Sequence, residues 1–347
     1  MGDILHALPA VTALRQAHPG WVIDWVVEPR WSALLAAEGS SGSASPCCAP
    51  NPQQPVVDHL HFAATKEWRK ALFSRDTVSA IRALRHGLRE GNYDVTLDMQ
   101  GALRSSILAS LTGSRRRIGE VEPREQAASW FSTDHVATRG AHVIEQDVEL
   151  ASAIAGDDLQ PVQPWLPVDP AAEAWADQIM PHAQPSILIN PGAGWGAKRW
   201  PVERYAAVAC HFAACGFRVI VNAGPGEEPL AEAIVNQAGG AALVLHCSLA
   251  QLIAVTRRVE LAIAGDTGPL HLACALGRPV VGIYGPTDPS RNGPYGTRFR
   301  VLRNPESKRD HTRYQDPEAG LLTIQPEEVL RAAEELLYPE KASQTVS

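Results

Sequence analysis

Two glycine-containing turns in the second half of the sequence have the residue types needed to bind a phosphate. The first reads Ala264-Gly265-Asp266-Thr267-Gly268-Pro269-Leu270-His271, between an apolar run and a short helix that Gly277 ends. A helix start attracts anions through its free N–H groups and positive dipole end, and glycine lets the backbone approach a ligand closely. Thr267 adds a hydroxyl donor, whereas Asp266 would repel a phosphate unless another group bonds it. A turn in which Asp266 or Thr267 simply caps the helix remains the alternative.

The second turn reads Asn190-Pro191-Gly192-Ala193-Gly194-Trp195-Gly196-Ala197-Lys198-Arg199-Trp200-Pro201. It also runs from a predicted strand to a helix, and Lys198 supplies a mobile positive charge for a diphosphate. The turn has no Gly-Lys-Ser/Thr, so it is not a Walker A loop. Two such turns in one half of the chain predict that a nucleoside diphosphate is held from both sides.

The elements that must position these turns alternate between strand and helix. Apolar runs predict strands at 21–27, 93–98, 186–190, 217–221, 259–264 and 280–284, and periodic patterns predict helices between them. Alternation of this kind is typical of an α/β fold with doubly wound parallel sheets, whose ligands bind at the carboxyl ends of the strands. The proline-rich segment 157–170 predicts a linker. We therefore expect two Rossmann-like domains with a cleft between them.

Composition and charge exclude several other classes. No apolar run is long enough to cross a membrane, the N-terminus does not resemble a secretory signal, and the six cysteines include no CxxC pair. We therefore expect a cytoplasmic protein without a metal ribbon or disulfide scaffold. The net charge of −7 argues against nucleic-acid binding. Residues 66–117 nevertheless carry a net charge of +6, which suits an anionic substrate, a membrane surface or simply solvated helix faces.

Four segments together resemble one enzyme family. They are MGDILHALPAVTALRQAHP at the start, DMQGALRSS, the lysine turn PGAGWGAKRWP, and GDTGPLHLACALGRPVVGIYGPTDP. In this order they resemble the ADP-heptose:lipopolysaccharide heptosyltransferases, which are inverting glycosyltransferases of the GT-B fold (glycosyltransferase family 9). WVIDWVVE, KEWRKALFS and GPTDP look closest to type I, which acts on the Kdo-lipid A inner core. The AKRWP sequence also occurs in type II.

The resemblance implies an organisation of the chain. It implies an acceptor-binding domain over residues 1–160 and a nucleotide-sugar-binding domain over 161–325. The helix at 326–338 is expected to pack back toward the N-terminal domain, and residues 339–347 to form a disordered tail. Relatives have a β-strand of about ten residues before the Met-Gly-Asp, so we expect the N-terminal sheet of the printed sequence to lack its first strand, through a misassigned start or a truncation.

The resemblance also implies residue roles. Asp3 stands at the general base, although an aspartate at a helix start is ordinarily a cap. Lys198 stands at the lysine that binds the donor diphosphate. The remaining donor-binding positions are Ala193, Gly194, Glu227 (ribose hydroxyls), Cys247 (adenine edge), Asp266, Thr267, Gly268 and His271, and the expected acceptor-binding residues are Arg69, Arg104 and Arg124. No metal or other cofactor is expected, since no acidic cluster has the spacing of Mg²⁺ ligands.

The expected partners are ADP-L-glycero-D-manno-heptose as donor and Kdo-lipid A as acceptor, with peripheral contact to the cytoplasmic face of the inner membrane. Three alternatives stay open: type II transfer to the first heptose, a sugar-nucleotide 2-epimerase on the same fold, and a truncated, inactive nucleotide-binding homologue. The epimerase would need no acceptor.

Overall fold

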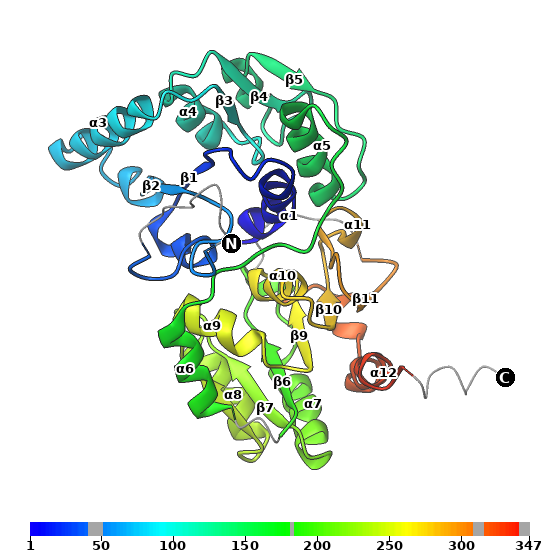
Figure 1. Ribbon diagram of the computed structural model, residues 1–347. Helices are drawn as coiled ribbons and strands as arrows, with labels where there is room; N and C mark the ends of the chain where they lie inside the picture. The colour runs from blue at the N-terminus through cyan, green and yellow to red at the C-terminus, as the bar shows by residue number, and fades with distance from the viewer. Residues whose placement is uncertain (41–50, 181–183, 308–315, 340–347) are drawn as a thin grey trace. The chain divides into compact units, whose positions relative to one another are not determined.

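The computed structural model describes residues 1–40, 51–180, 184–307 and 316–339 of the 347-residue chain. The chain folds into two compact units, and the boundary between them falls between Val168 and Asp169 (Figure 1). This boundary lies inside the proline-rich segment 157–170, slightly beyond the expected residue 160. The expected disordered tail lies outside the described residues, apart from Pro339.

The first unit contains two separate parallel sheets, one of β1 and β2 and one in the order β3-β4-β5. Helices lie between the strands in sequence, as the alternating pattern predicts. Its elements are α1 (Gly2–Ala17), β1 (Asp24–Val27), η1 (Pro29–Leu34), β2 (His59–Phe62), α2 (Thr65–Trp68), α3 (Arg75–Glu90), β3 (Val95–Leu97), α4 (Leu103–Leu111), β4 (Arg116–Glu120), η2 (Gln126–Phe131), β5 (Asp134–Val136) and α5 (Val143–Ala155).

A cavity of about 450 Å³ lies in the first unit and is lined by both β1 and β3. Gln100, which follows β3, bonds Asp3 of α1, and Arg104 of α4 bonds Thr65, which in turn bonds Glu28 after β1. The carboxyl ends of the strands are thus tied together, so β1 and β3 run in the same direction on the two sides of the cavity. Among the described strands, β1 pairs with β2 alone and β3 with β4 alone, so each uses one edge.

The walls of this cavity are suited to an extended segment. Ile4, Ala7 and Val11 of α1 face it from one side, and Leu88 and Leu108 face it from the other. Met1 lies at the end where the strands finish. A strand joined to the amine of Met1 would therefore run parallel to both neighbours and bury apolar side chains on both faces. This is the position at which we expect the strand that precedes Met-Gly-Asp in relatives.

The second unit contains one parallel six-stranded sheet in the order β11-β10-β9-β6-β7-β8. The order reverses direction from β6 outward, as in a doubly wound fold. Its elements are α6 (Pro170–Ile179), β6 (Ser186–Asn190), η3 (Gly196–Lys198), α7 (Val202–Ala214), β7 (Arg218–Asn222), α8 (Glu228–Gln237), β8 (Ala242–Leu245), α9 (Leu249–Thr256), β9 (Leu261–Gly265), α10 (Gly268–Ala275), β10 (Val280–Tyr284), α11 (Pro289–Asn292), β11 (Phe299–Arg303), η4 (Leu321–Thr323) and α12 (Pro326–Leu337).

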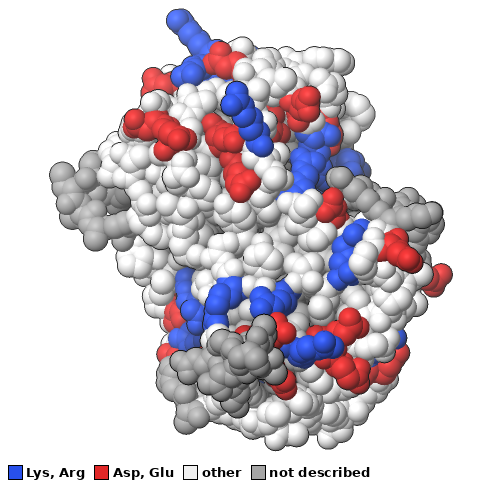
Figure 2. Space-filling model, turned by 90° about the vertical axis from the view of Figure 1, so that its right-hand side faces the viewer, with Lys and Arg blue, Asp and Glu red and all other residues white. Residues whose placement is uncertain are grey.

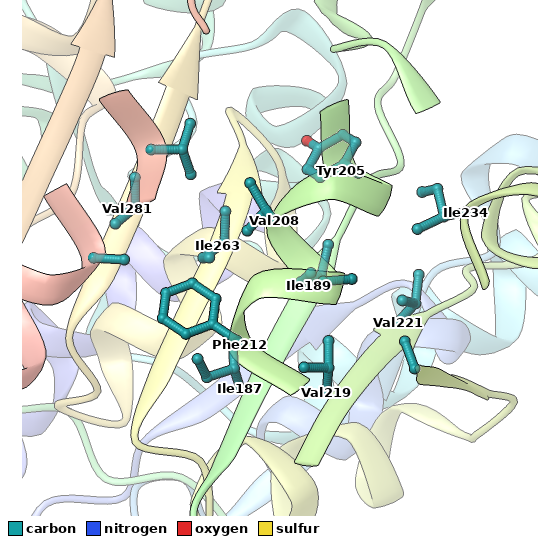
Figure 3. Close-up of a cluster of buried hydrophobic side chains, with 14 of the residues drawn as sticks. Ile187, Ile189, Tyr205, Val208, Phe212, Val219, Val221, Ile234, Ile263 and Val281 are labelled. Atoms are coloured by element: carbon teal, nitrogen blue, oxygen red, sulfur yellow. The ribbon is translucent and has the colours of Figure 1, made fainter. Parts of the chain in front are cut away.

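The core of the second unit lies between this sheet and α7. Val208 and Phe212 project from α7 toward Ile187 of β6 and Ile263 of β9 (Figure 3). The strands β6, β9 and β10 are buried along their whole length, which explains their nearly continuous apolar sequences. This rigid sheet fixes the positions at which the following turns begin.

Helix α12 belongs to the core of the second unit. Its buried residues Val329, Ala332, Ala333 and Leu336 lie in the same cluster as Ile187 and Phe212. The packing of this helix toward the N-terminal domain stays a prediction.

We expect an added strand to stabilise the first unit. A chain in which a short segment of alternating Val and Ile residues is fused to Met1 should unfold at a higher temperature, by about 4 °C or more, because the segment fills the cavity and pairs both open edges. Calorimetry on both chains measures this. A glycine–serine extension of equal length is the control. If both extensions raised the unfolding temperature equally, the cavity would not be the binding position of an apolar strand.

Candidate active site

Lys198, Asp266 and His271 form one buried cluster in the second unit. The ammonium of Lys198 donates to Oδ2 of Asp266 at 2.5 Å, and Nε2 of His271 lies 3.5 Å from Oδ1 of the same carboxylate. Burial alone would raise the pKa of Asp266, but the hydrogen bond of His271 and the charge of Lys198 outweigh it and hold that pKa well below its usual value. The carboxylate that would repel a phosphate is thus neutralised by two partners.

The two glycine-containing turns meet at this cluster because both leave the same edge of the sheet. Strands β6 and β9 are adjacent, with Asn190 paired to Ala264 in register. The lysine turn ends in η3, and the Trp195 ring lies 4.3 Å from the ammonium of Lys198 in a cation–π contact. The predicted convergence of Lys198 with the Asp266–His271 turn is therefore observed.

The alternative in which Asp266 or Thr267 caps the helix is not observed. Helix α10 has Thr267 as its N-cap residue but no side-chain capping bond, and the Thr267 hydroxyl donates to Gly265 at 3.2 Å instead. Asp266 bonds Lys198 and His271. Pro269 has no N–H, and the N–H groups of Leu270 and His271 donate to the Thr267 carbonyl. The N–H of Gly268, which no side chain caps, is therefore the group at the start of α10 that can bind an anion.

Glu227 joins the lysine turn to the turn after β7. Its carboxylate accepts hydrogen bonds from the backbone N–H groups of Gly224, at 3.2 Å, and Ala193. A Cβ at Gly192 would lie only 2.0 Å from Oε2 of Glu227, so a side chain at residue 192 would displace the Glu227 carboxylate from this position. Burial raises the pKa of Glu227, and the backbone hydrogen bonds offset part of that rise.

Cys247 lies beside the end of β7, where its thiol donates to Asn222 at 3.8 Å. Burial raises the pKa of this thiol to about 12, so it stays protonated at neutral pH. Cys247 follows β8 and Glu227 follows β7, so both lie on the same edge of the sheet as Lys198. Gly194 belongs to the lysine turn itself.

In the first unit, Asp3 is exposed in the first turn of α1 and does not cap that helix. Its Oδ2 accepts a hydrogen bond from the Gln100 amide at 2.6 Å. Gln100 is a site residue that our sequence reasoning missed, although it stands within the DMQG motif. The contact becomes visible only in the folded chain, where Gln100 follows the end of β3 and lies beside the first turn of α1.

The three expected acceptor-binding arginines follow strands of both sheets of the first unit, β2 in one and β3 and β4 in the other. Arg69 follows β2 and α2, Arg104 lies in the first turn of α4 after β3, and Arg124 follows β4. The guanidinium of Arg104 donates to the Thr65 hydroxyl at 3.4 Å, and a Cβ at Gly101 would lie 3.0 Å from the backbone nitrogen of Arg124. Gly101, which follows Gln100 and has a φ of +59°, thus brings the backbone of Arg124 close to this turn, and Arg104 lies three residues further along the chain.

The described residues contain neither a metal-binding cluster nor a membrane-spanning helix. No group of three or more His, Cys, Asp or Glu side chains is placed to hold a metal ion within the described ranges. Among the helices that the structure describes, none has the length and apolar character required to span a bilayer.

The sequence matches the family described as Glycosyltransferase family 9 (heptosyltransferase) over residues 81–322. It is 30% identical to lipopolysaccharide heptosyltransferase 1 of Escherichia coli (strain K12), over 88% of this chain and 91% of the relative. The chain belongs to glycosyltransferase family 9. It is also 27% identical to lipopolysaccharide heptosyltransferase 2 of the same strain, over 99% of this chain and 97% of that relative.

The solved structures agree with this assignment. The E. coli heptosyltransferase WaaC with ADP is similar, with a TM-score of 0.78, 27% identity and 97% of each chain covered. WaaC has also been solved with ADP-2-deoxy-2-fluoro heptose, and that structure gives a TM-score of 0.75, with 27% identity and 96% of each chain covered. The predicted GT-B fold is confirmed, and the family 9 chain is a glycosyltransferase of lipopolysaccharide biosynthesis.

The part of the chain that matches the family 9 description contains the donor-site residues but not Asp3. Lys198, Glu227 and Asp266 lie inside residues 81–322, whereas Asp3 lies before them. The role of Asp3 thus depends on its contact with Gln100 and on the resemblance of the first segment.

The ion pair predicts an unequal response to mutation. Asp266→Asn should lower the free energy of unfolding by about 3 kcal/mol, because it leaves the buried Lys198 ammonium without a carboxylate. Lys198→Met should cost less, because Asp266 keeps His271. Denaturant unfolding of both single variants and the double variant gives the coupling free energy. An equal loss in the two single variants would show that His271 does not support the carboxylate.

Proposed function

We propose that this glycosyltransferase transfers L-glycero-D-manno-heptose from ADP-heptose to a Kdo residue of Kdo-lipid A, with inversion at the anomeric carbon. The observation that carries the proposal is the convergence of Lys198 and the start of α10 beside a neutralised Asp266. The resemblance of the N-terminal segments to type I, and the bound ADP and fluoro-heptose analogue named for WaaC, support the choice of substrates.

The donor's diphosphate would bind between Lys198 and the Gly268 N–H at the start of α10. Both are held in place by the sheet before the reaction, so the charge that develops on departing ADP meets groups that are already oriented. Thr267 and Gly268 would bond the phosphate oxygens, and His271 would keep Asp266 paired when Lys198 turns to the donor. Glu227 would accept from the ribose hydroxyls, and Cys247 would contact the adenine edge.

Asp3 would act as the general base. The acceptor hydroxyl oxygen attacks the anomeric carbon from the face opposite ADP, the bond from that carbon to the diphosphate oxygen breaks, and the hydroxyl proton passes to the Asp3 carboxylate. The hydrogen bond from Gln100 leaves Oδ1 of Asp3 for that proton and fixes the orientation of the carboxylate. Gln100 is thus a positioning residue for the base.

The acceptor carries carboxylates and phosphates, and Arg69, Arg104 and Arg124 are the basic groups proposed to bind them. Because lipid A is a membrane lipid, the reaction would take place at the cytoplasmic face of the inner membrane, with the protein bound peripherally. Type II transfer to the first heptose is the second candidate, supported by the similarity to heptosyltransferase 2 over nearly the whole chain.

Acceptor-dependent turnover tests the proposal. ADP release from ADP-heptose should be fast with Kdo-lipid A and slow with either heptosylated acceptor or no acceptor. Release with the heptosylated acceptor alone would favour type II, and epimerised donor without acceptor would favour the epimerase. ADP binding without any turnover would identify an inactive nucleotide-binding homologue.

Substitution of Asp3 and Lys198 tests the residue roles in the same assay. Asp3→Asn, which keeps the size of the side chain, should lower kcat by about 10² or more, since general bases contribute roughly that much. Lys198→Met should lower kcat/KM to a similar extent. The control is Arg331→Gln on exposed α12, which should leave turnover unchanged. Near wild-type turnover of Asp3→Asn would refute the role of Asp3 while leaving donor binding intact.

Glu227 predicts a pH-dependent affinity for ADP. Its pKa is raised, so the carboxylate takes up a proton at a higher pH than an ordinary glutamate, and the affinity for ADP should fall early as the pH decreases from neutral. Glu227→Gln should weaken binding roughly tenfold at neutral pH, through loss of charge-assisted hydrogen bonds. Calorimetry across pH measures both effects. A Glu227→Gln variant with the same pH dependence as the wild type would assign the titration to another group.

A further inference from the structure

The segment before α3 exposes two large apolar side chains. Phe73 is 98% exposed and Leu72 is 54% exposed. Their backbone is nonetheless fixed, because Ser74 N–H donates to Ala71 at 3.0 Å and the Ser74 hydroxyl accepts from Thr77 N–H at 3.1 Å as the cap of α3. An apolar tip that is held in this way, rather than frayed, is a feature of contact surfaces.

Basic residues surround this tip. Lys66, Arg69 and Lys70 are exposed in α2 and the turn that follows it. Trp68, in contrast, packs against the buried cluster of Ala63, Leu84 and Leu88. The inward position of Trp68 anchors α2 to the unit and leaves the basic side chains on its outer side.

Helix α3 continues the basic surface. Arg75, Arg82, Arg85 and Arg89 are all exposed and follow one another at intervals of seven, three and four residues, so they lie on one face of the helix. The opposite face carries the buried Leu84 and Leu88. Helix α3 lies at the outer edge of its unit (Figure 1).

These arginines differ from many others in the chain. Within the described residues, none of the four on α3 makes an ion pair with a carboxylate, whereas Arg116, Arg258 and Arg300 do. Figure 2 shows the side of the molecule that is on the right in Figure 1, where Lys and Arg groups lie close to Asp and Glu groups. Residues 66–73 and α3 together carry seven Lys and Arg side chains against three acidic ones, Glu67, Asp76 and Glu90, which is a positive excess in a protein of net charge −7.

We propose that this surface, made of residues 66–73 and the arginine face of α3, binds an anionic lipid bilayer, with Phe73 and Leu72 entering the headgroup region. A helix with a basic face beside apolar side chains is the pattern of interfacial membrane binding. A nucleic acid fits less well, since the apolar tip has no role on a phosphate backbone and the net charge of the whole chain is negative. The inference rests on the proposed function in one respect, namely that the acceptor is a membrane lipid.

Vesicle sedimentation tests the surface directly. The full chain should bind phosphatidylglycerol-rich vesicles at least about tenfold more tightly than pure phosphatidylcholine vesicles. Phe73→Ser, and separately the double variant Arg82→Gln/Arg85→Gln, should each lower that binding by about tenfold. The matched controls are Leu243→Ser, which alters an exposed leucine of the second unit, and Arg291→Gln/Arg331→Gln, which removes two exposed arginines there.

Activity on detergent-dispersed acceptor separates this inference from the proposed function. Phe73→Ser and Arg82→Gln/Arg85→Gln should keep wild-type turnover in detergent and lose it only on vesicles. Vesicle binding without any turnover by the wild type would overturn the proposed function and leave the surface standing. Unchanged vesicle binding by both variants would overturn the surface. Complete displacement from vesicles by RNA, insensitive to Phe73→Ser, would overturn it in favour of a general polyanion site.

Discussion

The chemistry of the second unit depends on one carboxylate that is kept charged out of water. The side chain of Asp266 is 14% exposed and that of Lys198 only 9%, and a buried charge is stable only when it is paired. Asp266 has two partners, Lys198 and His271, on different elements. In the proposed reaction the ammonium of Lys198 turns from Asp266 to the diphosphate. Because Asp266 has a second partner, its carboxylate then remains paired with His271. A site with Lys198 as the sole partner would lose stability each time a donor bound.

The same geometric rule positions the groups in both units. Parallel strands finish at a common edge, so the residues that follow them are brought together whatever their separation in sequence. In the second unit this rule gathers Lys198, Glu227, Cys247 and Asp266, which follow β6, β7, β8 and β9. In the first unit it gathers Gln100 and the segments that carry the arginines. The lysine turn and the turn after β7 approach each other closely at Gly192, where the carboxylate of Glu227 occupies the space that a side chain would fill.

Much of this arrangement could be predicted from the sequence, because buried parallel strands have a strong pattern. The run at 186–190 has three consecutive apolar residues at its centre and the run at 280–284 has no charged residue, and they are found as β6 and β10 with the same bounds. The strands of the first unit were harder to predict. β2 reads His59-Leu60-His61-Phe62 and β4 begins with Arg116 and Arg117, since these short strands are only partly buried. Contacts such as Gln100 with Asp3 join residues far apart in sequence and have no local signal.

The first unit has two small sheets where the second has one sheet of six strands. Its strands are short and partly exposed, and its helix α1 is long and apolar. Helix α1 buries every residue from Leu5 to Arg15, and its Ala10 and Leu14 pack with Val148 and Ala151 of α5. Its packing therefore does not require that β1 and β3 be joined, and the two small sheets can each persist beside it. The position of Asp3, at the start of this helix, is accordingly determined by α1 and by Gln100 of the β3 side. A strand between β1 and β3 would add a further constraint on the base, since it would tie the backbone at Met1 to both sheets.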